Sequence, residues 1–164
     1  MKSLNRKKKQ LRNFQKNNTV KTKQLTVKSK TENLSAIRDF VSSYVAEAGI
    51  TPDIIENIIL AVDEACTNII KHAYHSEPDG EIIIKLKKNG NKFIVSITDF
   101  GNSFAPEKIP EPDLQKYYRQ RRVGGLGMYL MKTLMDDVKY NSVPGKFNEV
   151  LLSKNIKVEQ SNAG

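Results

Sequence analysis

The stretch from Asp63 to Tyr74, which reads DEACTNIIKHAY, constrains this chain most, because it continues an amphipathic helix with polar groups along one edge. Glu64 and Asn68 lie one turn apart, separated by roughly 40° around a helix of about 100° per residue. The opposite arc is apolar and wide enough to face a core: Ile54, Ile58, Ile59, Val62, Ala65, Cys66, Ile69 and Ile70. A carboxylate that can take a proton and an amide oxygen suited to Mg²⁺ therefore border a core-facing helix. Such a pair alone is more often two solvated residues, so its interpretation depends on later motifs.

The positive charge of the chain is concentrated at its N-terminus. Residues 1–30 contain eleven Lys or Arg and no Asp or Glu, and the remaining 16 basic and 18 acidic residues give residues 31–164 a net charge of −2. Residues 1–23 carry only scattered apolar side chains, so we expect a disordered basic tail there. Such a tail can contact nucleic acid or an acidic membrane surface. No interleaved aromatic pattern supports base stacking, so we favour a solubilising extension and consider nucleic acid an unlikely partner.

Length and composition limit the class of protein. The 164 residues fit one domain plus a tail, and the single cysteine excludes an internal disulfide or a cysteine-based zinc cluster. No apolar run approaches the length of a membrane span, and no apolar segment of a signal peptide follows the basic N-terminus. We therefore expect a cytoplasmic protein with a folded domain at 24–155 and a frayed C-terminus at 156–164.

Apolar periodicity and turn residues predict the order of the elements. The expected strands cover residues 24–29, 81–88, 92–99, 138–142 and 149–153, and the expected helices cover 34–48, 52–73 and 128–135. Asn89-Gly90 is a strong hairpin signal between the second and third strands.

Asp99 ends a strand whose alternation points its carboxylate the same way as Phe93, Val95 and Ile97. A carboxylate among core residues is destabilising unless it has a partner. Gly101 follows and permits a close approach to the backbone. An Asp that merely begins a turn would explain Asp99 about equally well.

A long segment and a glycine-rich turn follow. Residues 102–123 contain three prolines, several charges and little periodicity, which is typical of a functional lid or a mobile loop. Gly124-Gly125-Leu126-Gly127 then leads into an apolar helix, and free N–H groups at such a helix start can bind phosphate. Lys does not follow the last glycine, so the turn is not a Walker A loop, and simple helix capping would also explain it.

Together, E-x-x-x-N on a helix, D-x-G after a strand and G-x-G opening a helix resemble the GHKL ATPase superfamily. The segments AVDEACTNIIKHAY, TDFGNSFAP and GGLGMYLMKTLMD are closer still to the anti-sigma factor serine/threonine kinases of bacteria. The resemblance covers roughly residues 24–153. It implies an α+β fold, a two-layer α/β sandwich of the Bergerat type, in which three helices cover one face of a mixed, mostly antiparallel sheet.

The resemblance also implies roles for the residues of the first two motifs. Asn68 would coordinate the Mg²⁺ that bridges the ATP phosphates, and Glu64 would be the catalytic base or orient the attacking hydroxyl. Asp99 would accept a hydrogen bond from the adenine amino group, and Gly101 would let the base lie close.

The glycine-rich turn and the lid would complete the ATP site. Gly125, Leu126 and Gly127 would present backbone N–H groups to the phosphates, and residues 102–123 would form the ATP lid. Charge and placement, rather than a motif match, suggest that Arg121 or Arg122 reaches the γ-phosphate. Where the family often has a threonine near G-T-T, this chain reads GKFNEV, and Asn148 is the residue that could replace that contact.

The resemblance implies a kinase that transfers the ATP γ-phosphate to a serine or threonine of a STAS-domain anti-anti-sigma protein. The same kinase would hold a sigma factor away from RNA polymerase, with a homodimer left open. Three rivals remain: an ATP-binding regulator that sequesters a partner without kinase activity, a detached histidine-kinase catalytic domain, and a nucleic-acid-binding protein acting through its tail. The presence of Glu64 disfavours the first, and the lack of a phospho-acceptor hairpin before residue 24 disfavours the second.

Overall fold

The structure, a computed structural model, describes residues 22–103, 112–120 and 126–156. Its elements are β1 (Lys23–Lys28), α2 (Asn33–Glu47), α3 (Pro52–Asn68), η1 (Ile69–Ala73), β2 (Glu81–Asn89), β3 (Lys92–Asp99), α4 (Leu114–Arg119), α5 (Gly127–Leu134), β4 (Asp137–Val143) and β5 (Phe147–Asn155). Three predicted site residues, Arg121, Arg122 and Gly125, lie outside the described residues, as does nearly all of the predicted tail and of the predicted frayed C-terminus.

The five strands form one sheet in the order β1-β2-β3-β5-β4, and the predicted two-layer α+β architecture is confirmed. All four pairings among the described strands are antiparallel, so the parallel pair that a mixed sheet would contain is absent there. The strand order explains why no parallel pair forms among the described strands. Strand β4, which follows α5, runs in the same direction as β3, but β5 inserts between them and pairs with both.

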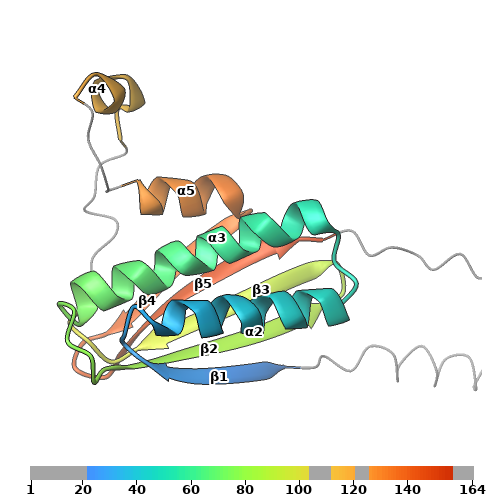
Figure 1. The fold of residues 1–164 in the computed structure, drawn as a ribbon, viewed down its shortest axis with the longest axis horizontal. Helices are drawn as coiled ribbons and strands as arrows, with labels where there is room; N and C mark the ends of the chain where they lie inside the picture. The colour runs from blue at the N-terminus through green and yellow to red at the C-terminus, as the bar shows by residue number, and fades with distance from the viewer. Residues whose placement is uncertain (1–21, 104–111, 121–125, 157–164) are drawn as a thin grey trace, which may run out of the picture.

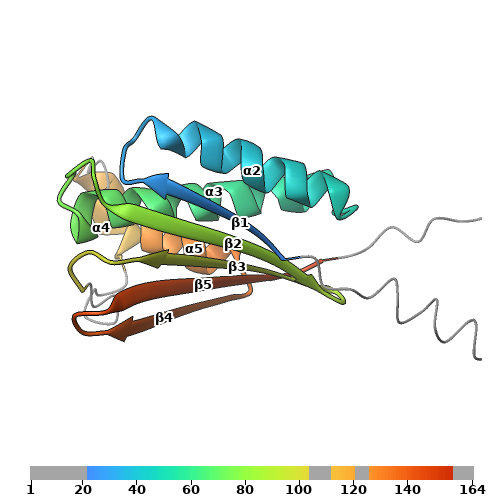
Figure 2. The ribbon, with the colours of Figure 1, turned by 90° about the horizontal axis from the view of Figure 1, so that it is seen from below.

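Helices α2, α3 and α5 cover one face of the sheet, and no described helix covers the other (Figures 1 and 2). The core lies between these two layers. Period-two alternation sends buried side chains of β2, β3 and β5 toward the helices: Ile82, Ile84, Leu86, Phe93, Val95, Ile97, Val150 and Leu152. Helices α2 and α3 contribute buried apolar side chains at helical spacing to the same core: Ile37, Val41, Val45, Ile58, Val62 and Cys66. None of the helices in the described ranges is long and apolar enough to cross a membrane.

The long helix predicted for residues 52–73 is present but changes character in its last turn. It begins at Pro52 after Thr51, and α3 passes directly into the π-helical turn η1. The Tyr74 N–H donates to the Ile69 carbonyl at 3.1 Å, which closes the wider turn. His75 and Ser76 then take positive φ values of 50° and 66° and end the helix.

Helix α4 lies within residues 102–123, where the sequence shows little periodicity and for which we expected a lid or loop without predicting a helix. The Lys116 N–H donates to Asp113 Oδ1 at 3.0 Å, so Asp113 caps the helix start. Pro112 and Asp113 were the available signal. The six residues of α4 are too few to show an apolar period, which is why the pattern alone missed this helix.

Candidate functional site

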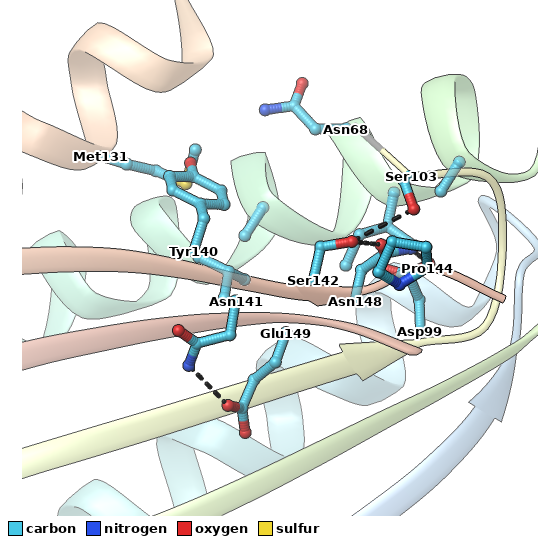
Figure 3. Close-up of a pocket in the computed structure, with 14 residues that line it drawn as sticks. Asn68, Asp99, Ser103, Met131, Tyr140, Asn141, Ser142, Pro144, Asn148 and Glu149 are labelled. Carbon is cyan, nitrogen blue, oxygen red and sulfur yellow. Dashed lines mark hydrogen bonds between the residues drawn. The ribbon is translucent and has the colours of Figure 1, made fainter. Parts of the chain in front are cut away.

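A cavity of about 380 Å³ opens between the helix layer and the β3-β5-β4 side of the sheet. Its volume lies within the usual range of small-molecule sites. Met131 and Tyr140 lie together at one end of the cavity, and Asp99, Ser142 and Asn148 gather at the other (Figure 3). The lining comes from α3, η1, α5 and three strands: Ala65, Asn68, Ile69, Ala73, Asp99, Ser103, Met131, Tyr140, Asn141, Ser142, Pro144, Asn148, Glu149 and Val150.

Glu64 and Asn68 lie where α3 packs against the first turn of α5. A Cβ built on Gly127 would collide with the Glu64 carboxylate and lie 3.4 Å from Asn68 Nδ2. Glycine therefore lets the start of α5 approach these two side chains without displacing the Glu64 carboxylate. Neither side chain makes a hydrogen bond or an ion pair with another residue in the part of the chain that the structure describes. Their neighbour Asp63, in contrast, is paired with Arg38 at 2.8 Å.

Asp99 is buried at the end of β3, with 3% of its surface exposed. Its Oδ1 accepts hydrogen bonds from the Gly101 N–H at 2.9 Å and from Asn148 Nδ2 at 2.9 Å. Burial raises the pKa of this carboxyl, and the hydrogen bonds from Asn148 and Gly101 oppose that rise. No described residue donates to Oδ2. The inward aim predicted from the strand alternation is confirmed, and the carboxylate keeps one open acceptor beside the cavity.

Gly101 packs closely against the backbone of Ala73 at the end of η1. A Cβ at this position would lie 2.6 Å from the Ala73 carbonyl oxygen, and the Asn102 N–H donates to that oxygen at 2.9 Å. The glycine is therefore required by the end of η1, a structural reason that the sequence did not reveal.

Tyr74, directly after η1, holds the end of β3 through its hydroxyl. Its hydroxyl donates to the Glu81 carbonyl at 2.7 Å and accepts the Phe100 N–H at 2.8 Å. The residues around Asp99 are thus anchored to η1 and to the start of β2, which gives the carboxylate a fixed position.

The described lining of the cavity contains two carboxylates, Asp99 and Glu149, and no Lys, Arg or His. Among the described residues, no cluster of three or more His, Cys, Asp or Glu side chains could hold a metal ion by itself. A metal at Asn68 would therefore need further oxygen ligands from a bound molecule. That donor set suits Mg²⁺, which usually combines one or two protein ligands with phosphate oxygens and water.

The structure brings Glu64, Asn68 and Gly127 together and places Asn68 and Asp99 in one cavity. Leu126 and Gly127 form the start of α5, but neither lines the cavity.

Tyr140 and Ser142 are cavity residues that the sequence analysis did not single out. Both share the inner face of β4 with Val138, and this period-two pattern was the signal that could have found them. Burial raises the pKa of Tyr140 to about 12.

Comparisons with known proteins identify the family and the fold of this chain. The profile of the histidine kinase-like ATPase domain matches residues 27–154. The chain is 39% identical over 119 residues to the serine-protein kinase RsbW of Listeria monocytogenes, and the aligned region covers 70% of this chain and 76% of that protein. It is 35% identical over 127 residues to the serine-protein kinase RsbW of Bacillus subtilis, spanning 74% and 79% of the two chains.

A solved structure shares the fold. The crystal structure of the RsbU and RsbW domains of a Mycobacterium tuberculosis protein superposes with a TM-score of 0.61 at 15% identity. The match covers 83% of this chain and 32% of the other.

Proposed function

Since the chain belongs to the histidine kinase-like ATPase family and, within it, to the anti-sigma factor serine/threonine kinases, we propose that it phosphorylates a STAS-domain anti-anti-sigma protein with Mg·ATP and sequesters a sigma factor. The relatives named serine-protein kinase support a protein hydroxyl as the acceptor. A sigma factor acts at RNA polymerase, so the proposed place of action is the cytoplasm. A homodimer is compatible with this proposal.

The observation that carries the proposal is a set of three unpartnered polar groups. Asn68 and Asp99 line one cavity, and Glu64 lies one turn before Asn68 on α3. Within the described residues, the Glu64 carboxylate, the Asn68 amide and Asp99 Oδ2 have no hydrogen-bond partner. Polar groups of a folded protein are normally satisfied by its own chain or by water. Three open groups in and next to one cavity favour a ligand that complements all three.

At its end of the cavity, Asp99 recognises the base. Its open Oδ2 is an acceptor and fits an N–H donor such as the adenine amino group. Apolar side chains that also line the cavity, Ile69, Met131 and Val150, suit the faces of a flat ring.

The phosphates bind where α3 packs against the first turn of α5, next to Asn68. The first N–H groups of α5, beginning at Gly127, have no acceptor within the helix and can donate to phosphate oxygens. Asn68 offers its amide oxygen to Mg²⁺. We also assign phosphate contacts to Leu126, Gly125 and Arg121 or Arg122, and Arg121, Arg122 and Gly125 lie outside the described residues.

Mg·ATP supplies the transferable phosphoryl group and the cation that neutralises its charge. Glu64 accepts the proton of the attacking serine or threonine hydroxyl, or holds that hydroxyl in line. Its carboxylate is available because no described side chain pairs with it. Phosphoryl transfer needs mainly positioning and charge neutralisation, which this set of groups provides.

The first experiment is transfer of labelled γ-phosphate from Mg·ATP into proteins of a lysate of the source organism. Parent chain and Glu64→Gln are compared with Glu56→Gln, the same substitution at an exposed position of the same helix. We expect one small labelled protein with the parent and with Glu56→Gln, and transfer about 10²–10⁴-fold slower with Glu64→Gln.

A different pattern would redirect the proposal. Intact ATP binding without labelling of any protein would favour the regulator that sequesters a partner without kinase activity. Equal transfer by the Glu64→Gln and Glu56→Gln variants would remove Glu64 from the catalytic role.

A further inference from the structure

Asn148 is the centre of the polar contacts at the Asp99 end of the cavity. Its Nδ2 donates to Asp99 Oδ1 at 2.9 Å and to the Gly101 carbonyl at 3.2 Å. Its Oδ1 accepts from Ser142 Oγ at 2.7 Å, on the side of β4 (Figure 3). The strand register explains this meeting, because β5 lies between β3 and β4. Asn148 is directly opposite Asp99 on one side and Ser142 on the other.

The orientation of the Asn148 amide follows from its neighbours. On the side of β3, the nearby polar atoms are oxygens: Asp99 Oδ1, the Gly101 carbonyl and, at 3.5 Å, the Asn102 carbonyl. Only the NH₂ end of an amide can satisfy oxygens. Ser142 gives its single hydroxyl proton to Asn148 Oδ1. The hydrogen bond between Ser103 Oγ and Ser142 Oγ, at 3.1 Å, therefore uses the proton of Ser103.

The amide leaves the two oxygens of Asp99 unequal. Oδ1 receives two donors, Asn148 Nδ2 and the Gly101 N–H, whereas no described residue donates to Oδ2. A carboxylate pinned through one oxygen cannot rotate to hide the other.

We propose that Asn148 is a positioning residue for the base-binding carboxylate: it holds Asp99 Oδ1, so that Oδ2 remains the one open acceptor and selects a purine that donates an N–H at that point. This inference rests on the proposed function, because it assumes that Asp99 meets the base of a nucleotide. It goes further by placing the selectivity in a residue of β5 that acts through Asp99. The amide protons of Asn148 are already committed to Asp99 and Gly101, so none remains for the ligand.

The inference predicts a coupling between Asn148 and one group of the ligand. ATP and purine riboside triphosphate, which lacks only the 6-amino group, are compared by calorimetry on the full-length chain. For the parent chain, loss of the 6-amino group weakens binding about tenfold, since it leaves buried Oδ2 without a donor. Without Asn148 holding Oδ1, Asp99 reorients and this ratio falls below about threefold.

Two variants of the same shape isolate the donor. Asn148→Thr and Asn148→Val are both β-branched and suit a strand, and they differ in one hydroxyl that can donate to Asp99. We expect Asn148→Thr to keep the parent's discrimination between the two nucleotides and Asn148→Val to lose it.

A purely structural role for Asn148 would weaken the binding of both nucleotides by the same factor and leave their ratio at the parent value, and this outcome would overturn the inference. If the Asn148→Val chain does not fold, the Ser142→Ala variant provides the test, because it removes the donor that holds Asn148 Oδ1. If Ser142→Ala leaves the ratio of the two nucleotide affinities at the parent value, the inference is overturned as well. If the parent chain binds neither nucleotide, the proposed function itself fails, which is a distinguishable result.

Discussion

Two carboxylates at opposite ends of the β3–β5 ladder have opposite surroundings. Asp136 accepts the Asn155 backbone N–H on Oδ2 at 2.5 Å and Lys154 Nζ on Oδ1 at 3.3 Å. The backbone bond to Asn155 is the largest cause of its lowered pKa. Asp99, at the other end, is bonded through one oxygen alone, and burial raises its pKa.

The difference separates a carboxylate that serves the fold from one that we propose is kept for a ligand. Both oxygens of Asp136 are used by the chain, so it stabilises the turn between α5 and β4. Asp99 is the more buried of the two and yet retains an open acceptor, which opposes stability. The end of the sheet around Asp99 is therefore built at the expense of stability, whereas the end around Asp136 contributes to it.

The variant expected to have the largest effect at the Asp99 end is Asn68→Ala. Asn68 has no partner among the described residues, so its loss leaves the fold intact and removes the proposed Mg²⁺ ligand. We expect the Mg²⁺ affinity of the ATP complex to fall about a hundredfold. Titration of Mg²⁺ into the chain with ATP measures this, with Asn57→Ala on the same helix as the control. Retained Mg²⁺ dependence would mean that another residue holds the metal.

Asp99→Asn should act in opposite directions on binding and on stability. ATP affinity falls about tenfold or more, because an acceptor becomes a donor facing a donor. At neutral pH the free energy of unfolding rises, because a buried charge is removed. A raised folded-state pKa gives stability that is present below the ordinary pKa of Asp and is lost as the pH rises through the raised value.

The stability gain of Asp99→Asn should therefore be present at neutral pH and vanish in acid. Thermal unfolding of parent and variant at pH 7 and in acid, with calorimetry of ATP, measures both effects. A variant less stable than the parent at neutral pH would show that Asp99 serves the fold, as Asp136 does.

Asp136→Ala should give the smallest effect and the reverse sign. It removes the bonds to Asn155 and Lys154, and the free energy of unfolding falls by about 1 kcal/mol, because solvent screening weakens bonds to a side chain that is 37% exposed. Because the folded state lowers this pKa, the stabilisation is present above the ordinary pKa of Asp and is lost as the pH falls through the lowered value. Denaturant unfolding at pH 7 and in acid tests this, and ATP affinity should not change.

Local signals predicted most of the fold. Period-two alternation predicted β2 and β3, and Asn89-Gly90 predicted the hairpin between them. Thr51-Pro52 predicted the start of α3. These signals succeed because each depends on residues that are neighbours in the chain. The short helix α4 and the π-helical turn η1 were missed, because neither produces a repeat long enough to read.

The candidate site was predictable only in part. Spacing on one helix put Glu64 beside Asn68, and alternation aimed Asp99 inward. The family resemblance was needed to connect Asp99 with the helix, since no local pattern encodes which strand end faces which helix. The requirement for glycine at Gly101 comes from Ala73, a tertiary contact that a sequence pattern does not contain.

The pairing of β3 with β5 also bears on how the cavity is assembled during synthesis. Asp99 and its amide partner Asn148 are 49 residues apart, whereas the β2–β3 hairpin closes within a short stretch of chain. Contacts between distant residues form slowly, because a long loop must close first. A nascent chain can therefore pair its first three strands while Asp99 still lacks its partner. A nucleotide that binds only the completed cavity draws the chain toward its finished form by mass action, so the substrate also helps its own enzyme to mature.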